Sequence, residues 1–196
     1  EEVVSIDVVK PYLIENTTAT DLSDVSKKVP GVSIVDGQAN IRGGSGYSYG
    51  AGSRVQVLVD DLPLLSGDLS EVRWNFVPME NIEQIEVIKG ASSALYGSAA
   101  MNGVIHVRTG WASDKPETKL QVYQNVWDNP KRELLRWWGR NESPFQTGAF
   151  FSHRRKVKAV DLVVGAHYHQ TRNFLQSADN LRGRVNVKTR WQPKKV

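Results

Sequence analysis

The sequence contains no cysteine among its 196 residues. A disulfide, a thiolate nucleophile and a cysteine-ligated metal are therefore excluded. It also lacks any apolar run near the ~20 residues that a transmembrane helix needs. This second absence does not exclude membrane-spanning strands, because a strand that alternates between a lipid face and a polar face keeps the average hydropathy low.

Neither sign of charge dominates, since 25 basic and 21 acidic residues give a net charge of +4. So modest an excess is a weak indication of nucleic-acid binding, and no nucleic-acid partner is expected. The hydrophobic share of 40% argues against disorder. Residues 1–4 show none of the basic and apolar features of a signal segment, as expected of a cytoplasmic protein or of a mature or trimmed chain.

The first part of the sequence, up to about Gly110, mixes helix and strand signals with glycine turns. A short helix is predicted to open at Asn16 and to end at Pro30, with one face formed by Leu22, Val25 and Val29. Strands are predicted over residues 32–35, 54–59, 81–89 and 103–108, with a short helix over 91–96. We therefore expect residues 1–110 to form one α+β domain.

The second part, residues 111–196, carries strand signals only, over 120–127, 147–153, 159–169 and 182–191. The third of these strands alternates most clearly. Val160, Leu162, Val164, Ala166 and Tyr168 share one face, and Asp161, Val163, Gly165, His167 and His169 share the other. Its length suits a tilted membrane strand of ~9–11 residues. Soluble antiparallel sheets alternate in the same way, so this pattern alone leaves both open.

Four blocks in the first part follow one another in a specific order. They are Ile-Arg-Gly-Gly at 41–44, Val-Gln-Val-Leu-Val-Asp-Asp-Leu-Pro at 55–63, the stretch 85–100 through Gly90 and Tyr96, and Asn-Gly-Val-Ile-His-Val-Arg-Thr at 102–109. In this order and spacing they resemble the plug domain of TonB-dependent outer-membrane receptors. The sequence at residues 90–93 and 102–104 is similar to that of receptors from the Bacteroidetes group.

This resemblance implies an α+β plug domain over residues 1–110, with a small mixed sheet and short helices. It implies that residues 111–196 are the N-terminal antiparallel strands of an incomplete transmembrane β-barrel. Most of the barrel, and an upstream segment that contacts TonB, are then expected to lie outside this sequence.

The function that the resemblance implies is ligand-gated, TonB-energised import of a scarce nutrient across the outer membrane of a Gram-negative bacterium. The nutrient could be a siderophore, cobalamin, a saccharide or a peptide. The implied partners are TonB, the nutrient and the outer-membrane lipid. No cofactor and no metal site are expected.

Two positions depart from the pattern of the family. Asp61 stands where the family usually has glycine after an aspartate, and His106 stands where it usually has asparagine. We therefore expect the turn after Val59 to use a different conformation, while the plug assignment holds.

Ligand contact is expected from two segments that the resemblance places near the outward-facing apex of the plug. Tyr47 and Tyr49 lie in the glycine-rich stretch 43–52, and Arg73 and Trp74 end the segment after residue 64. Aromatic side chains give contact area at little cost in conformational entropy. A phosphate-binding role for the glycine-rich stretch is disfavoured, because a strand rather than a helix follows it.

Charged residues suggest a second kind of site. Arg42, Glu86 and Lys89 lie in plug motifs, and the resemblance implies that such residues pair with each other and with the barrel wall. The alternative is an ordinary surface ion pair. In the last strand Arg182, Arg184, Lys188 and Arg190 share one face, which must point into the barrel lumen because cations on the lipid face cost ~2–4 kcal/mol each at the midplane.

Little in the sequence supports a catalytic function. A nucleophile elbow would need Gly-x-Ser-x-Gly, but position 94 is alanine. His167 and His169 share a strand face, yet two imidazoles without a third ligand make a weak metal site. We therefore expect that this protein is not an enzyme.

Two other classes remain open. One is a soluble ligand-binding module without transport function. The other is a nucleic-acid binder that stacks bases on Trp137, Trp138 and Trp191.

Overall fold

The computed structural model describes residues 5–17, 19–44, 47–48, 52–67, 71–136, 138, 143–173 and 178–193. The chain divides into two compact units, Glu1–Gly110 (unit 1) and Trp111–Val196 (unit 2). Within the described ranges, every helix is too short or too polar to cross a membrane.

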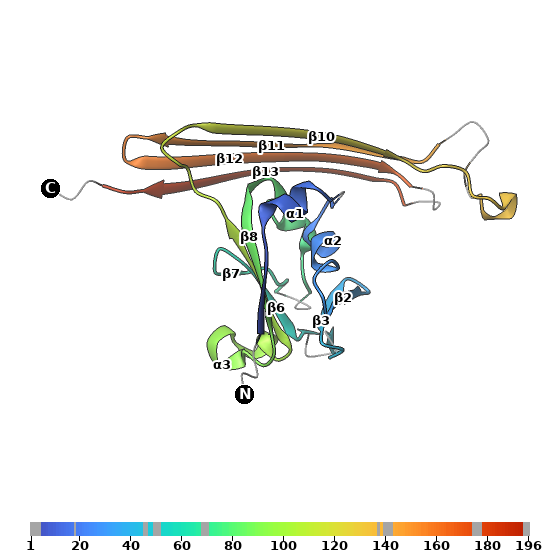
Figure 1. Ribbon diagram of the computed structural model, residues 1–196, viewed down its shortest axis with the longest axis horizontal. Helices are drawn as coiled ribbons and strands as arrows, with labels where there is room; N and C mark the ends of the chain where they lie inside the picture. Colours follow the sequence, from blue (N-terminus) through green and yellow to red (C-terminus); the bar gives the residue numbers. More distant parts are fainter. Residues whose placement is uncertain are drawn as a thin grey trace. The chain divides into compact units, whose positions relative to one another are not determined.

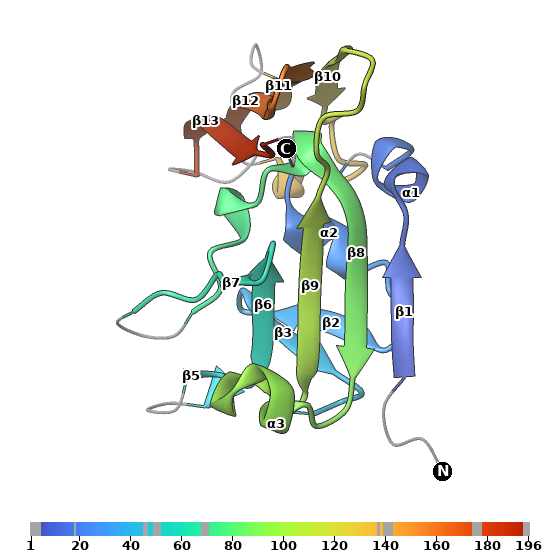
Figure 2. The ribbon, with the colours of Figure 1, turned by 90° about the vertical axis from the view of Figure 1, so that its left-hand side faces the viewer.

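Unit 1 is built on a mixed five-stranded sheet. Its strands are β1 (Ser5–Val9), β6 (Val55–Val59), β7 (Leu62–Pro63), β8 (Ile82–Lys89) and β9 (Gly103–Thr109). They lie in the order β1-β8-β9-β6-β7, which Figure 2 shows from one side. Only β6 and β9 pair in parallel; the other neighbours are antiparallel. The α+β fold with a small mixed sheet is therefore confirmed.

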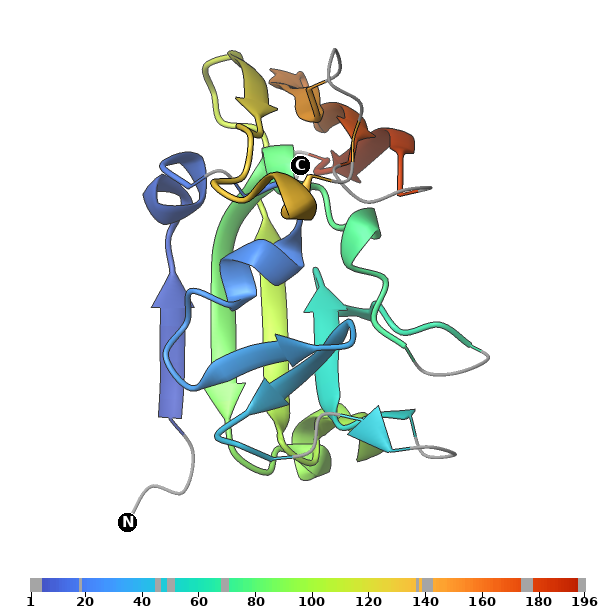
Figure 3. The same cartoon turned by 90° about the vertical axis from the view of Figure 1, so that its right-hand side faces the viewer.

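One face of this sheet holds the main core of unit 1. Ile85, Val87, Ile105, Val107 and Val57 alternate onto it and are almost completely buried. Helix α2 (Leu22–Ser26) and the hairpin of β2 (Val32–Val35) and β3 (Gln38–Ile41) lie across it (Figure 3). The apolar residues of these strands are therefore buried within unit 1 itself.

The opposite face carries a smaller apolar cluster at one end. Leu58, Ile88, Ala100 and Val104 are buried together, with Tyr96 packed against them. The cover comes from α3 (Ser93–Tyr96) and the 3-10 turn η3 (Ser98–Ala100), which connect β8 to β9 (Figure 2). The remaining elements of unit 1 are α1 (Pro11–Glu15), β4 (Tyr47–Ser48), β5 (Gly52–Ser53), η1 (Trp74–Phe76) and η2 (Met79–Asn81).

The predicted start of the first helix was wrong. The structure has α1 before Asn16, and α2 begins only at Leu22, where Asp21 is the N-cap and its carboxylate accepts a hydrogen bond from the Asp24 amide at 3.2 Å. Aspartate and asparagine cap the free N–H groups of a first turn equally well, so both Asn16 and Asp21 carried the signal of a helix start. Leu22, Val25 and Val29 are buried as predicted.

Unit 2 is a four-stranded antiparallel sheet. Its strands are β10 (Glu117–Val126), β11 (Phe145–Val157), β12 (Val160–Arg172) and β13 (Asn180–Trp191), in sequence order (Figure 1). A short 3-10 turn, η4 (Glu133–Leu135), lies between β10 and β11. The four predicted strands are confirmed, and the sheet does not close, so β10 and β13 are its edges.

The register divides the residues of this sheet between two faces. The charged face carries, among others, Tyr123, Phe150, Asp161, His167, His169, Arg182, Arg184, Lys188 and Arg190. The apolar face carries Leu120, Val122, Phe151, Leu162, Val164, Ala166, Tyr168, Val185, Val187 and Trp191. Several large side chains of the apolar face are exposed, with 75% exposure for Val185 and 70% for Leu120, whereas Leu162 and Val164 are half-buried.

Candidate functional site

The glycine-rich stretch forms a small hairpin in which Tyr47 pairs with Ser53 and Ser48 with Gly52. The backbone of Tyr47 is part of β4, while Tyr49 lies outside the described residues. Contact of these two tyrosines with a ligand stays a prediction.

The segment that ends in Arg73 and Trp74 folds back on itself. Leu65 and Val72 form an isolated antiparallel bridge, and the Ser66 amide donates to the Glu71 carbonyl at 2.8 Å. Arg73 is exposed, whereas Trp74 is only 8% exposed and its indole N–H donates to the Gly37 carbonyl at 2.6 Å. Trp74 thus anchors this segment on the β2–β3 turn, and Arg73 is the more accessible of the two residues.

Glu86 belongs to a cluster of charges on β8 and β9. Its carboxylate accepts from Arg108 Nε at 3.1 Å and from Gln84 Nε2 at 2.6 Å. The hydrogen bond with Glu86 raises the pKa of the Arg108 guanidinium, which stays charged. Arg108 was not among the predicted site residues, although its place two residues after His106 on a strand puts both on one face.

Lys89 makes a second tie within unit 1. Its side chain is nearly buried, and its ammonium group pairs with the Asp7 carboxylate and donates to the Pro30 carbonyl at 2.6 Å. Arg42, which has a left-handed φ of 52°, donates to Ser5 Oγ at 2.6 Å. Both contacts hold β1. Pairing of Arg42, Glu86 or Lys89 with a barrel wall stays a prediction.

The two departures from the family pattern lie side by side. Asp60 and Asp61 have φ of 48° and 69°, which makes the β6–β7 connection a type I′ turn, the turn that Asp-Gly favours. The expected change of turn conformation was therefore wrong. His106, 2% exposed, has its Nε2 atom 3.2 Å from Asp61 Oδ1, without hydrogen-bond alignment.

The aspartate at position 60 holds the same turn from its other side. Its carboxylate accepts from the Thr109 amide at 2.8 Å and from the Thr109 hydroxyl at 2.5 Å. Asp60 thus fastens the turn between β6 and β7 to β9 by two hydrogen bonds, while Asp61 lies next to His106 of the same strand.

The four basic residues of β13 lie on the charged face, as their alternation predicts. Arg184 is directly opposite His167, and Arg182 is opposite His169. Arg190 donates to the buried Asp161 carboxylate through Nη2 at 2.6 Å and Nε at 3.0 Å. That this face lines a lumen stays a prediction.

Trp111, the first residue of unit 2, is held by the same strand. Lys188 Nζ lies 3.6 Å from the centre of its ring, and Arg190 Cζ lies 4.3 Å from it. Cations at this distance are attracted by the face of an indole ring. The connection that precedes β10 is thereby fixed on the charged face of β13, at the opposite edge of the sheet from β10.

The two histidines of β12 form a polar network rather than a metal centre. Tyr123 Oη lies 2.7 Å from His169 Nδ1, and Thr171 Oγ1 lies 2.7 Å from His169 Nε2. The His167 ring stacks on Phe150 with centroids 4.2 Å apart. Among the described residues, no group of three potential metal ligands comes together. Tyr123, from a different strand, was not identified from the sequence, because the register that brings it near His169 is a tertiary property.

Comparison with known proteins identifies the first unit. Residues 1–104 match the model of the TonB-dependent receptor plug domain. The chain belongs to the TonB-dependent receptor plug domain family. Membership locates the protein in the outer membrane of a Gram-negative bacterium and disfavours the soluble ligand-binding module.

Individual relatives match a little more than half of the chain. The vitamin B12 transporter BtuB of Vibrio vulnificus is 39% identical over 112 residues, which are 56% of this chain and 18% of that protein. The ferric enterobactin receptor PirA of Pseudomonas aeruginosa is 29% identical over 125 residues, 57% of this chain and 17% of that protein. These relatives are transporters and receptors. The chain spans less than a fifth of their length.

Solved structures extend the similarity of fold to both units. The siderophore receptor PirA from Pseudomonas aeruginosa superposes with a TM-score of 0.72 at 24% identity, covering 98% of this chain and 32% of that one. The unliganded ferric citrate transporter FecA gives a TM-score of 0.75 at 17% identity, with 99% and 29% covered. The plug-like sheet followed by antiparallel strands is thus the fold of the matched part of these receptors.

Proposed function

We propose that this chain is the plug, residues 1–110, and the first wall strands, residues 111–196, of a receptor that imports a nutrient across the outer membrane. A ligand binds from outside, and TonB, acting on a segment upstream of β1, supplies the energy that opens a path past the plug. The observation that carries this proposal is the combination, in one chain, of a plug-family domain with a sheet that has one charged and one apolar face.

The two faces suggest how the sheet is oriented. Val185, Val187 and Leu120 expose large apolar surfaces that water disfavours and lipid accepts. The cations of β13 would cost ~2–4 kcal/mol each at the midplane of a membrane, so they point into the lumen. Arg190 with Asp161, and Trp111 with its two cations, then form part of the lumenal wall.

The nutrient is a ferric siderophore or cobalamin, as the names of the relatives suggest. Contact with it comes from Tyr47, Tyr49 and Arg73, with Trp74 holding the segment of Arg73 in place. Replacing Tyr47, Tyr49 and Trp74 together by alanine in the full-length receptor lowers the affinity of uptake. An unchanged affinity would contradict this assignment.

The wall assignment is tested with spin labels in the full-length receptor in bilayers. A label at Val187 is reached by lipid-soluble oxygen, and a label at Lys188 by a water-soluble relaxant. The reverse pattern, or access of water to both positions, would overturn the assignment. Transport itself is tested by growth of a deletion strain on ferric siderophores as sole iron source and on cobalamin, with the full-length gene restored as control.

A further inference from the structure

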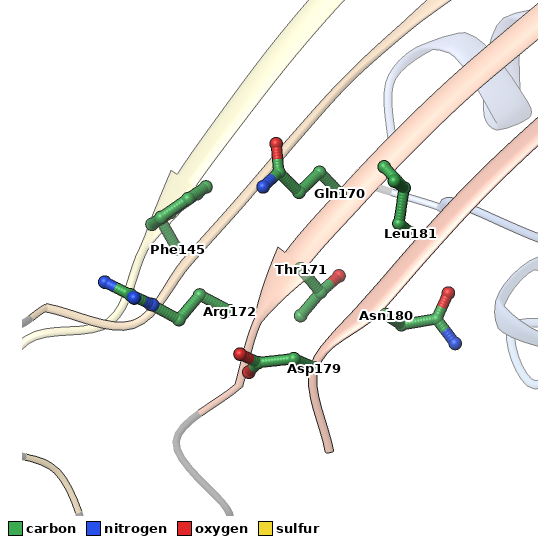
Figure 4. A pocket seen from close by; sticks show the side chains of 7 residues that line it. All are labelled: Phe145, Gln170, Thr171, Arg172, Asp179, Asn180 and Leu181. Carbon is green, nitrogen blue, oxygen red and sulfur yellow. The ribbon is translucent and has the colours of Figure 1, made fainter. Parts of the chain in front are cut away.

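The two ends of the four-stranded sheet of unit 2 differ. One end holds a pocket of about 470 Å³, lined by Phe145 of β11, the end of β12 and the start of β13 (Figure 4). Residues 127–144 and 173–179 make the connections at that end, whereas β11 and β12 are joined at the opposite end only by the turn at 158–159. Outer-membrane barrels have short periplasmic turns and longer extracellular loops. The end with the two-residue turn is therefore the periplasmic end of the proposed wall.

The chain enters unit 2 at this periplasmic end, but at the opposite edge of the sheet from its first strand, β10, which begins at Glu117. Trp111 lies under two cations of β13, with Lys188 Nζ 3.6 Å and Arg190 Cζ 4.3 Å from the centre of its ring. In the ladder Arg190 is opposite Asp161, close to the two-residue turn. The segment from Trp111 to β10 is therefore held at its start by β13.

Residues 111–116 have little spare length for this crossing. The edges β10 and β13 are three strand spacings of ~4.8 Å, or ~14 Å, apart. Six residues reach at most ~20 Å when fully extended. Part of this reach is lost because the segment bends where Ser113 Oγ donates to the Lys115 carbonyl at 2.9 Å. The segment is therefore nearly taut while the ring of Trp111 stays on β13.

Arg190 is not free to leave the ring of Trp111, because it also neutralises a buried carboxylate. Its Nη2 and Nε atoms donate to Asp161 at 2.6 and 3.0 Å, and the Asp161 side chain is only 2% exposed. Removing the partner of a buried carboxylate is strongly destabilising. Asp161 belongs to β12, which pairs with β13 from Val160 to Thr171. Trp111 is therefore anchored on two paired strands and not on one side chain alone.

The last residues of unit 1 are also fixed. The amide and the hydroxyl of Thr109 donate to the Asp60 carboxylate at 2.8 and 2.5 Å. The Gly110 amide donates to the Asn81 carbonyl at 2.9 Å. Gly110 and Trp111 are consecutive, so a single peptide bond joins the fixed end of unit 1 to the fixed start of unit 2. Tension on unit 1 is therefore transmitted through this bond directly to Trp111.

We propose that Trp111 is a tension-bearing anchor, which fixes the C-terminal end of the plug on the wall while TonB pulls at its N-terminal end. The inference rests on the proposed function, because only a plug that is pulled from upstream of β1 carries this tension. β1 is an edge strand of the unit 1 sheet, whereas β9, which ends next to the anchor, is its middle strand. The pull therefore removes β1 first, while β9 stays in place as the strand on which the plug re-forms.

Single-molecule force spectroscopy tests the anchor in the full-length receptor in a bilayer, pulled by a handle attached upstream of β1. In the wild type, we expect residues 111–116 to be released in a step of their own, after unit 1 has unfolded. In Trp111→Ala this step disappears, and the unfolding of unit 1 releases up to ~20 Å more chain. Trp111→Phe keeps an aromatic face and Lys188→Gln keeps one of the two cations, so both variants retain the step at a lower force.

The matched control is Trp191→Ala, which leaves the step and its force unchanged. Trp191 follows Arg190 on β13 but is 73% exposed and lies on the apolar face. An equal change in this control would mean that the step reports the stability of β13, and would overturn the proposal. A wild-type step in Trp111→Ala would overturn it as well. If Trp111→Ala does not fold, an unchanged force in both Trp111→Phe and Lys188→Gln is the result that overturns it.

A measurement in cells keeps this inference apart from the proposed function. Uptake of ferric siderophore and of cobalamin is measured together with entry of a large hydrophilic antibiotic that the outer membrane excludes. Trp111→Ala is expected to admit the antibiotic only in cells with active TonB, because the released plug no longer returns to its place; exclusion equal to that of the wild type would contradict the anchor. A wild-type receptor that shows the step but takes up neither nutrient contradicts the import function and leaves the anchor standing. Uptake by a wild-type receptor without the step does the reverse.

Discussion

Unit 1 and unit 2 place their apolar side chains in opposite ways. In unit 1 the strands bury Ile85, Val87 and Ile105 between the sheet and its cover. In unit 2 the large apolar residues that the structure buries, within the described ranges, are Phe150 and Val163, while Leu120, Val122, Val185 and others lie exposed. The charged face of unit 2 instead holds buried polar groups such as Asp161 and His169.

This difference is the one expected if the two units are stabilised in different surroundings, water for unit 1 and lipid for the proposed wall of unit 2. A unit with its own apolar core gains about 25 cal/mol per Å² of apolar surface removed from water. A sheet with its apolar side chains outside gains nothing from water there and needs an apolar medium, whereas its charged face needs partners such as Arg190 for Asp161. In the proposed receptor, strands thus serve a packed core in unit 1 and a membrane wall in unit 2.

The largest expected effect tests the wall directly. In the full-length receptor in liposomes, Val187→Lys is expected to lower the free energy of unfolding by ~2–4 kcal/mol, the cost of a cation at the middle of the lipid face. Unfolding in urea measures this cost. The matched control, Gln124→Lys, lies on the same face near its extracellular end and should cost only ~0–1 kcal/mol. Equal costs at the two positions would show that this face does not lie against a lipid bilayer.

A smaller effect is expected for the buried charge in unit 1. Lys89→Met leaves the Asp7 carboxylate without its ammonium partner and removes the bond to the Pro30 carbonyl. The Asp7 side chain is 41% exposed, so water screens part of this charge. We therefore expect the free energy of unfolding to fall by ~1–3 kcal/mol, less than for a fully buried pair. Hydrogen exchange of the β1 amides in the full-length receptor should accelerate accordingly.

The control for Lys89 is Lys27→Met. Lys27 pairs with Asp24 at 3.5 Å, and both side chains are well exposed. Exposed pairs of this spacing contribute only ~0.3–0.5 kcal/mol. Similar exchange in the two variants would mean that the tie from Lys89 to β1 contributes no more than a surface pair.

The smallest effect concerns the turn between β6 and β7. Asp61→Gly relieves a left-handed backbone conformation that glycine adopts freely, but it also removes the contact with His106. We expect the two changes nearly to cancel, and the same substitution in a His106→Asn background to stabilise by about 0.5–1 kcal/mol. Thermal unfolding of the four proteins of this cycle measures the coupling. Equal effects of Asp61→Gly in both backgrounds would show that the two residues are independent.

Much of the fold follows from the sequence, because local patterns carry it. The alternation in residues 160–169 and 182–191 predicted both faces of the unit 2 sheet, since side chains on a strand alternate whatever the strand pairs with. The order of the plug motifs predicted unit 1 and its family. The start of α2 was misplaced, because two capping residues compete within a few positions and only packing chooses between them.

The tertiary structure alone decided which side chains meet. The pairs Lys89 with Asp7 and Tyr123 with His169 join residues from different strands, and their contacts depend on register, which no local pattern states. Gly148 shows the same dependence, because a β-carbon there would lie 2.4 Å from Tyr123 Oη and 2.5 Å from the Tyr168 carbonyl oxygen. The sequence by itself determined which face each side chain occupies. The pairing of strands decided its neighbours, because contact across a sheet is set by the ladder and not by the distance along the chain.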